Sequence, residues 1–339
     1  MGVESEIDRL MSAYQGRVPG ASVLVLHDGK AVVRKGYGMA NLERAEVATP
    51  QTNYRLASVS KQFTAAAILL LTQDGKLGLD DRLRHWLPSL PDATRPITIQ
   101  HLLTHSSGLV DYEDLMDQDQ TWQLRDQDVL HLLEGENRLY FAAGSGYRYS
   151  NGGYALLALI VEKASGKTFQ QFLRERIFLP LGMHNSQAHV AEGMEIAHRA
   201  YGYSEIDGAW QRTDQSNTSA VLGDGGIYSS IDDLARGFAG ARLPALDFGA
   251  DDGLSFAERG ERAVVRGDLS FDETIVWVKD ADRIDFDIRP LLLDGRARIA
   301  ALDLFEGHEL GAAGGLGELG GGAGGADLLG EIVDGDLLV

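Results

Sequence analysis

The sequence predicts a mixed α/β (α+β) fold, and three observations along the chain predict it. A β-hairpin comes first, a long helical stretch follows, and β-type segments return towards the C-terminus. At 339 residues and 44% apolar composition, the chain can bury a sizeable core in two closely packed lobes or two domains. The expected architecture is an antiparallel sheet flanked by helices, beside a mostly helical lobe.

The first elements are an N-terminal helix and the hairpin. Apolar residues recur at helical spacing over residues 4–15, which predicts an amphipathic helix. Two β-type runs follow, Ala21–His27 and Lys30–Gly36. They flank Asp28-Gly29, a dipeptide typical of a two-residue hairpin turn, so the two strands are expected to pair antiparallel.

The helical stretch is built around one apolar run. Residues Val59 to Leu71 are apolar almost all round, which predicts a central helix buried on every face and ending at Asp74-Gly75. A capping box at Thr168–Gln171 marks one later helix start, and Gly166 follows the end of the helix before it. Further helices are expected over residues 98–104, 126–134, 152–164, 168–177 and 230–239.

Ser58 and Lys61 form the most informative pair in the chain. They lie one helical turn apart at the start of the apolar run, so the Lys61 amine can reach the Ser58 hydroxyl. Free N–H groups at a helix start favour a developing oxyanion, and a lysine in a dry interior can act as a base. Without further support, the simpler interpretation is that Ser58 caps the helix and that Lys61 points into solvent as a cation.

A second motif, Tyr149-Ser-Asn151, lies about ninety residues further on and precedes another apolar helix. A tyrosine and an asparagine two residues apart can face the same site from a short loop. Tyr149 would serve as a proton relay and Asn151 as an amide donor to substrate.

Together the two motifs resemble the serine β-lactamase and penicillin-binding-protein superfamily, whose members carry a Ser-x-x-Lys signature. The resemblance is strongest to the branch of class C β-lactamases, D-Ala-D-Ala carboxypeptidases and related esterases. It covers about residues 5–240. Supporting segments lie in the family's order: Ala21–Val33, Leu102–Leu109, Phe178–Met183 and Gly225–Ala235.

The resemblance implies an acyl-transfer reaction with Ser58 as nucleophile, Lys61 as base and Tyr149 in the proton relay. Substrates with this chemistry are β-lactams, D-amino-acid peptides and short-chain esters, and the motifs do not choose between them. In the resembled fold the hairpin joins C-terminal strands in one antiparallel sheet. Residues 1–57 and about 241–310 would then form a sheet lobe, and residues 58–240 the helical lobe.

The family's third motif, Lys-Thr-Gly or His-x-Gly, has no clear copy here. The nearest candidate for this substrate contact is His308 in Gly307-His-Glu-Leu-Gly311, where one residue too many separates histidine and glycine. Ala263–Val265, Thr274–Val278 and Arg296–Leu302 are candidate strands for the sheet.

Composition changes near residue 241. Residues 241–339 hold 21 acidic and 9 basic side chains, and nine of the fifteen residues from Gly311 to Gly325 are glycine. The run Gly311–Gly325 is interpreted as a flexible linker or loose loop, and residues 311–339 form a Gly-rich tail to which the sequence assigns no structure. Three explanations of the C-terminal third stay open: a divergent sheet half, a separate small module, or an out-of-frame reading of a GC-rich gene.

Bulk properties exclude several partners. A net charge of −19 argues against nucleic acid and anionic membranes, since both need a basic face. The absence of cysteine excludes disulfides and thiolate metal sites. No segment is long enough to span a membrane, and the N-terminus lacks a signal peptide. The expected location is therefore the cytoplasm, or the periplasm or exterior if the chain is a trimmed mature form.

No cofactor and no metal are expected. His101 and His105 have the spacing of paired metal ligands on a helix, but no third ligand accompanies them, and His105 is interpreted as structural. The acidic runs Asp111–Asp114 and Asp117–Gln120 are interpreted as solvated surface. The aromatic residues Trp122, Tyr140 and Tyr147 are interpreted as core.

The expected partner is a small-molecule or peptide substrate, and no sequence feature fixes the oligomeric state. The missing third motif leaves one alternative open: a non-catalytic binding or assembly protein on the same scaffold. A histidine-triad esterase is disfavoured because the chain has no Gly-x-Ser-x-Gly elbow.

Overall fold

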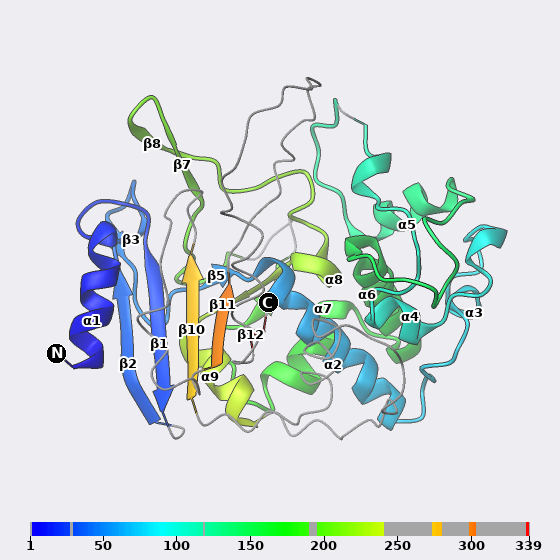
Figure 1. Ribbon diagram of the computed structural model, residues 1–339, viewed down its shortest axis with the longest axis horizontal. Coiled ribbons are helices and arrows are strands. Elements are labelled where there is room, and N and C mark those ends of the chain that lie inside the picture. Colours follow the sequence, from blue (N-terminus) through cyan, green and yellow to red (C-terminus); the bar gives the residue numbers. More distant parts are fainter. Residues whose placement is uncertain are drawn as a thin grey trace, which may run out of the picture.

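The structure is a computed structural model that describes residues 2–27, 30–117, 119–189 and 195–240. It also describes the backbone of three later strands, at 273–279, 298–302 and 337–338 (Figure 1). Several sequence predictions therefore lie outside the described residues: the turn residues Asp28 and Gly29, the strand at Ala263–Val265, the third-motif candidate His308, and the Gly-rich run 311–325.

A five-stranded sheet forms one side of the molecule, with the strand order β12-β11-β10-β1-β2. The hairpin prediction is confirmed, because β1 (Ala21–His27) pairs antiparallel with β2 (Lys30–Tyr37), and His27 lies opposite Lys30. On its other edge β1 pairs antiparallel with β10 (Glu273–Lys279). The N-terminal hairpin and a strand from the C-terminal third thus share one sheet.

The sheet is mixed, whereas a wholly antiparallel sheet was expected. Strands β10, β11 (Arg298–Leu302) and β12 (Leu337–Leu338) run parallel to one another. Parallel neighbours need a crossover of about a dozen residues or more, and residues 280–297 leave that length between β10 and β11. The strand predicted at 274–278 falls within β10, and the one predicted at 296–302 overlaps β11 from residue 298 on.

Helices cover both faces of β1. Helix α1 (Val3–Leu10) continues into a 3-10 turn (Met11–Tyr14) where a single helix was expected over residues 4–15. Alternate residues of β1 pack against this segment, while Leu24 points into the core on the opposite side, as the two-residue repeat of a strand requires. Helix α9 (Ile231–Gly240) contacts β1 and β10.

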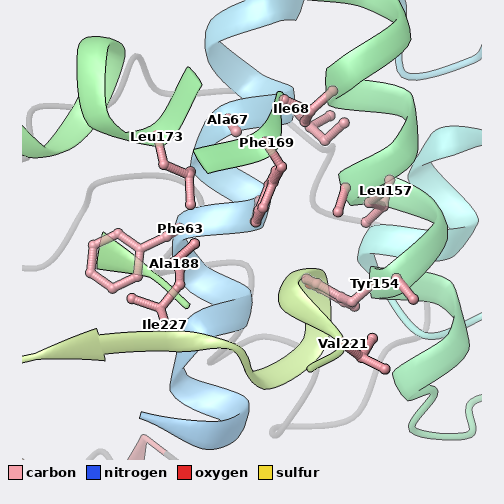
Figure 2. Packing of buried hydrophobic residues seen from close by; sticks show 14 of the residues in the cluster. Phe63, Ala67, Ile68, Tyr154, Leu157, Phe169, Leu173, Ala188, Val221 and Ile227 are labelled. Carbon is pink, nitrogen blue, oxygen red and sulfur yellow. The ribbon is translucent and has the colours of Figure 1, made fainter. Parts of the chain in front are cut away.

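Helix α2 (Ser60–Gln73) lies at the centre of the larger core, between the sheet and the other helices (Figure 1). Its residues from Ser60 to Leu71 are buried apart from Gln62 and Leu70, which confirms the prediction of a helix buried on almost every face. Helix α6 (Asn151–Ser165) packs against it. Figure 2 shows Ile68 on the side of α2 where Leu157 of α6 and Phe169 of α7 (Phe169–Leu173) lie, whereas Phe63 lies on the other side of α2, near Leu173 and Ala188.

Shorter elements complete the helical part. The helices are α3 (Leu83–Trp86), α4 (Ile99–Leu103), α5 (Asp126–Glu134) and α8 (Leu222–Gly225), with 3-10 turns at Ala57–Val59, Asp92–Thr94 and Glu113–Leu115 and a π-turn, Arg174–Phe178, that continues α7. The small sheets pair β3 (Met39–Asn41) with β4 (Glu46–Val47), β9 (Ile227–Ser229) with β5 (Tyr54–Arg55) and β6 (Gln187–Ala188), and β7 (Tyr203–Ile206) with β8 (Ala209–Arg212).

Candidate active site

Ser58 lies in a 3-10 turn, Ala57–Val59, immediately before α2. The sequence placed it at the start of the helix itself. A backbone hydrogen bond anchors this turn to β9, because the Leu56 N–H donates to the Ile227 carbonyl at 2.8 Å. Ala57 has a φ of 42°, a left-handed conformation that a side chain with a Cβ adopts only at a cost. The strained turn leaves the Ser58 side chain exposed ahead of a buried helix.

The Lys61 side chain is buried, with 7% of the residue exposed, and points at three acceptors. Its Nζ lies 3.2 Å from Ser58 Oγ, 2.8 Å from Asn151 Oδ1 and 2.9 Å from the carbonyl oxygen of Asp224. An ammonium group has three hydrogens, so these acceptors satisfy it completely. The structure therefore brings Ser58, Lys61 and Asn151 together in one chain of hydrogen bonds.

Asn151 and Tyr149 reach this group from the start of α6. Asn151 is the first residue of the helix, and the Ser150 hydroxyl caps it by accepting the Gly153 N–H at 3.0 Å. The sequence placed both residues on a short loop; a capped helix start fixes Asn151 more firmly. The Tyr149 ring centroid lies 4.7 Å from Lys61 Nζ, and Tyr149 is 39% exposed. Lys61 and Tyr149 thus share one face of the site.

His105 is a buried residue that contacts both Tyr149 and Ser150. It is 1% exposed, and its ring packs on Tyr149 with the centroids 4.6 Å apart. Its Nδ1 accepts the Ser150 N–H at 3.1 Å. Burial, and then the charge of Lys61, lower the pKa of His105 to about 3, so the ring is neutral at ordinary pH. The structural interpretation of His105 is supported by these contacts.

The His101–His105 spacing does not make a metal pair. The α4 helix ends at Leu103 and His105 has a left-handed φ of 55°, so the two rings do not share a helix face. His101 Nδ1 instead accepts the Thr98 N–H at 3.2 Å and completes a capping box. Within the described ranges, no group of three or more His, Cys, Asp and Glu side chains is placed to hold a metal ion.

The neutral His105 makes stability depend on pH in a predictable direction. The unfolded chain binds a proton at this residue near pH 6.5, whereas the folded chain resists it until about pH 3. Its contribution is therefore complete above pH 6.5 and is lost as the pH falls, by up to about 1.4 kcal/mol per pH unit. Urea unfolding of the parent and His105→Gln at several pH values below 6.5 should give a shallower acid loss in the variant.

Two buried carboxyls with raised pKa values, Asp126 and Asp224, contribute in the opposite direction over part of this range. Both proteins carry them, so their effect cancels in the comparison between parent and variant. Parallel stability profiles for the two proteins would contradict the assignment of His105 as a neutral buried histidine.

Glu113 is a member of the site that the sequence analysis missed. Its Oε1 accepts the Asn151 Nδ2 hydrogen at 3.0 Å, which extends the chain Ser58, Lys61, Asn151 by one carboxylate. Burial, followed by the neighbouring charge of Asp111, raises the pKa of Glu113. The acidic run 111–114 was interpreted as solvated surface; only the fold brings one of its carboxylates against a residue from another helix.

The one-turn helix α8 provides a further contact to Lys61. Its Asp224 carbonyl accepts from Lys61, and its Gly223 carbonyl accepts the Thr64 hydroxyl at 2.7 Å. The buried Asp126 carboxylate accepts the N–H groups of Leu222 and Gly223, each at 2.9 Å. Side chains from α2 and α5 therefore hold α8 against the catalytic lysine candidate.

The aromatic residues near the site are not core, contrary to the sequence interpretation. Trp122 is 61% exposed and Tyr147 is 40% exposed, while the Tyr140 hydroxyl donates to Asp114. They lie in irregular segments rather than on a buried helix face, which explains why their aromatic character did not bury them.

No helix in the described parts of the chain is long and apolar enough to cross a bilayer.

The fold joins a mixed sheet to a helical part, and a Ser-x-x-Lys turn leads into the central helix, a motif typical of the class of β-lactamases and penicillin-binding proteins. A family model described as Beta-lactamase matches residues 4–270. The chain belongs to the β-lactamase family. The match extends 30 residues beyond residue 240, where the resemblance carried by the motifs ended.

Curated relatives include a penicillin-binding protein and a D-aminopeptidase. The chain is 35% identical to "Penicillin-binding protein 4*" of Bacillus subtilis (strain 168) over 229 residues, 63% of this chain and 50% of that protein. It is 33% identical to "D-aminopeptidase" of Brucella anthropi over 235 residues, 68% of this chain and 44% of that protein. The chain thus spans about half the length of these relatives or less.

Solved structures share the fold. The octameric penicillin-binding protein homologue from Pyrococcus abyssi is 31% identical, with a TM-score of 0.59 over 69% of this chain and 54% of its own. D-amino acid amidase from Ochrobactrum anthropi SV3, in complex with L-phenylalanine amide, is 27% identical, with a TM-score of 0.61 over 70% of this chain and 69% of its own. These comparisons show that the chain shares the fold of penicillin-binding-protein and D-amino acid amidase structures.

Proposed function

We propose that the protein is a serine hydrolase that forms an acyl-enzyme at Ser58 on an amide or ester carbonyl. One observation carries the proposal: the buried Lys61 amine contacts the exposed Ser58 hydroxyl at 3.2 Å and is oriented by Asn151 on its other side. An activated serine needs a base within hydrogen-bond reach and a third group that orients that base. The names of the relatives, D-aminopeptidase and D-amino acid amidase, support the reaction class.

The proposed reaction has two halves. Ser58 Oγ bonds to the carbonyl carbon while its proton passes to the neutral Lys61 amine. The tetrahedral oxyanion is stabilised by the Ser58 N–H, which supplies one donor of the oxyanion site. Tyr149, beside Lys61, relays the proton to the leaving nitrogen or oxygen as its bond to carbon breaks. Water then attacks the ester carbonyl and gives up a proton to the same relay, which frees the acid product and restores Ser58.

Trapping Ser58 tests this function. Intact mass should show one adduct per chain after exposure to a reactive phosphonate ester, and none on Ser58→Ala. Parallel exposure to a penicillin reports whether a β-lactam is also accepted. The non-catalytic alternative predicts no adduct from either probe, so an unmodified parent protein would contradict the proposal.

Among the substrates that suit this machinery, Glu113 favours those with a free ammonium group. Its carboxylate is hydrogen-bonded to Asn151, and Asp111 and Asp114 lie on the same segment. An incoming cation would gain a charge-assisted hydrogen bond, whereas the carboxylate of a penicillin would be repelled. We therefore propose D-amino-acid amides or peptides with a free amino group as substrates.

Glu113→Gln should lower kcat/KM for a D-amino-acid amide with a free amino group by roughly tenfold, the range of one hydrogen bond to a charged group. The N-acetylated amide should be hydrolysed by parent and variant at similar rates, because it carries no cation. Asp114→Asn is the matched control, since Asp114 is on the same 3-10 turn but accepts from Tyr140. Equal losses for both amides would overturn the proposed recognition by Glu113.

A further inference from the structure

Asp224 is a buried carboxyl that the proposed reaction does not use. It lies on α8, is 6% exposed, and its own backbone carbonyl accepts from Lys61 Nζ at 2.9 Å. Its side chain accepts the Tyr112 hydroxyl at 3.2 Å. Tyr112 itself is fully buried. A residue that contacts the base with its backbone thus carries an ionisable side chain in the same dry region.

The charges around Lys61 are unevenly distributed. Among the described residues, the carboxyls of Asp111, Glu113 and Asp224 interact with its ammonium group. Asp111 and Glu113 lie on the rim of the site, whereas Asp224 lies inside, where Arg55 is a second cation. Burial raises the pKa of Asp224 to about 6, while Lys61 and Arg55 act to lower it. The neutral His105 and the phenols of Tyr149 and Tyr154 are further titratable neighbours of Lys61 among the described residues, with the two phenol ring centroids 4.7 and 5.7 Å from Lys61 Nζ.

We propose that Asp224 is a positioning residue that holds Lys61 in its ammonium form until substrate binds, through a carboxylate fixed by the Tyr112 hydroxyl. The three acceptors around Lys61 Nζ match an ammonium group, yet a base must be neutral to take the Ser58 proton. A negative charge in the low-dielectric interior favours the charged lysine far more than the same charge at the rim. The inference rests on the proposed role of Lys61 as the base.

The consequence is a shift in the pH dependence of Ser58 reactivity. Asp224→Asn keeps the size of the side chain and an oxygen for the Tyr112 hydroxyl but removes the charge. Lys61 should then lose its proton at lower pH, so the acid limb of the Ser58 phosphonylation rate should move down by about one pH unit. At a pH on that limb, the variant should react up to about ten times faster than the parent.

Two further variants separate charge from structure. Tyr112→Phe removes the donor to Asp224, so it should move the acid limb in the same direction but by less. Asp126→Asn alters a buried carboxyl that accepts the N–H groups of Leu222 and Gly223 at the start of α8 rather than contacting Lys61 or Tyr112, so it should not move the limb down even if the rate falls. The rate of phosphonate labelling across pH 5 to 9, measured by intact mass, reads out all three variants.

The outcomes are distinct. A limb that moves down for Asp224→Asn and does not move down for Asp126→Asn supports the inference. A limb that stays in place for Asp224→Asn and Tyr112→Phe, or moves up, overturns it while Ser58 labelling still supports the hydrolase. Absence of labelling in the parent overturns the proposed function itself. If Asp224→Asn does not fold, the shift of the acid limb of the labelling rate in Tyr112→Phe decides whether the inference holds.

Discussion

Ser58→Ala should reduce hydrolysis by a factor of roughly a thousand or more, and Lys61→Ala should reduce it almost as far. In the proposed reaction, Ser58 supplies the oxygen that bonds to the acyl group, and without Lys61 that oxygen would keep its proton. Because the two act as one unit, the double variant should be no slower than Ser58→Ala alone. Steady-state rates on a D-amino-acid amide, together with phosphonate labelling, measure the effect.

Two exposed residues serve as controls for these substitutions. Ser145→Ala and Lys76→Ala remove a hydroxyl and an amine from the surface, and both should leave the rates unchanged. Thermal unfolding of Lys61→Ala should stay cooperative. A loss of turnover in a protein that still folds would show that Lys61 acts as a base and not merely as a packing residue. A Lys61→Ala protein with near-parental turnover would refute the proposed pairing of Ser58 with Lys61.

Gly223→Ala should have the largest effect on the fold around the site. A Cβ at residue 223 would lie 2.2 Å from the Tyr154 carbonyl oxygen and 2.8 Å from the Ala158 Cβ, closer than any real contact. The α8 turn would have to move away from α6, and the Thr64 and Asp126 hydrogen bonds to it would weaken. Overpacking of this kind costs about 1–3 kcal/mol, and the lost hydrogen bonds add to that.

The same displacement should carry the Asp224 carbonyl away from Lys61, so Ser58 labelling should fall together with stability. Urea unfolding and phosphonate labelling measure the two effects on one sample. Gly135→Ala is the matched control, since its Cβ would meet only the Leu132 carbonyl at an ordinary 3.5 Å. A stable, fully reactive Gly223→Ala protein would show that α8 does not hold the lysine in place.

Local elements of this fold follow from the sequence because their causes are local. The Asp28-Gly29 dipeptide between the two β-type runs predicts the pairing of β1 with β2, and the apolar surface of α2 requires burial on nearly every side. The fold class and family membership were likewise accessible, because Ser58-x-x-Lys61 and Tyr149-x-Asn151 are specific as a pair. Each motif lies within a few residues of one helix start, so it can be recognised without information on the rest of the chain.

The mixed sheet lay beyond local reasoning. The hairpin predicts antiparallel pairing only for the strands that it joins, and the direction of β11 depends on a long connection. The left-handed Ala57 and the 3-10 turn at Ser58 depend in the same way on contacts made from outside, such as the Leu56 hydrogen bond to β9.

By itself, the sequence determined the pair of motifs, the buried central helix and the hairpin, since spacing along a helix or across a turn already brings those residues together. Only the tertiary structure decided which carboxyls surround Lys61. Glu113 and Asp224 are separated from it by 52 and 163 positions, and no periodic pattern marks either one. Their contacts arise because α6 and α8 pack against α2, and such long-range packing is set by the whole core rather than by any segment of it.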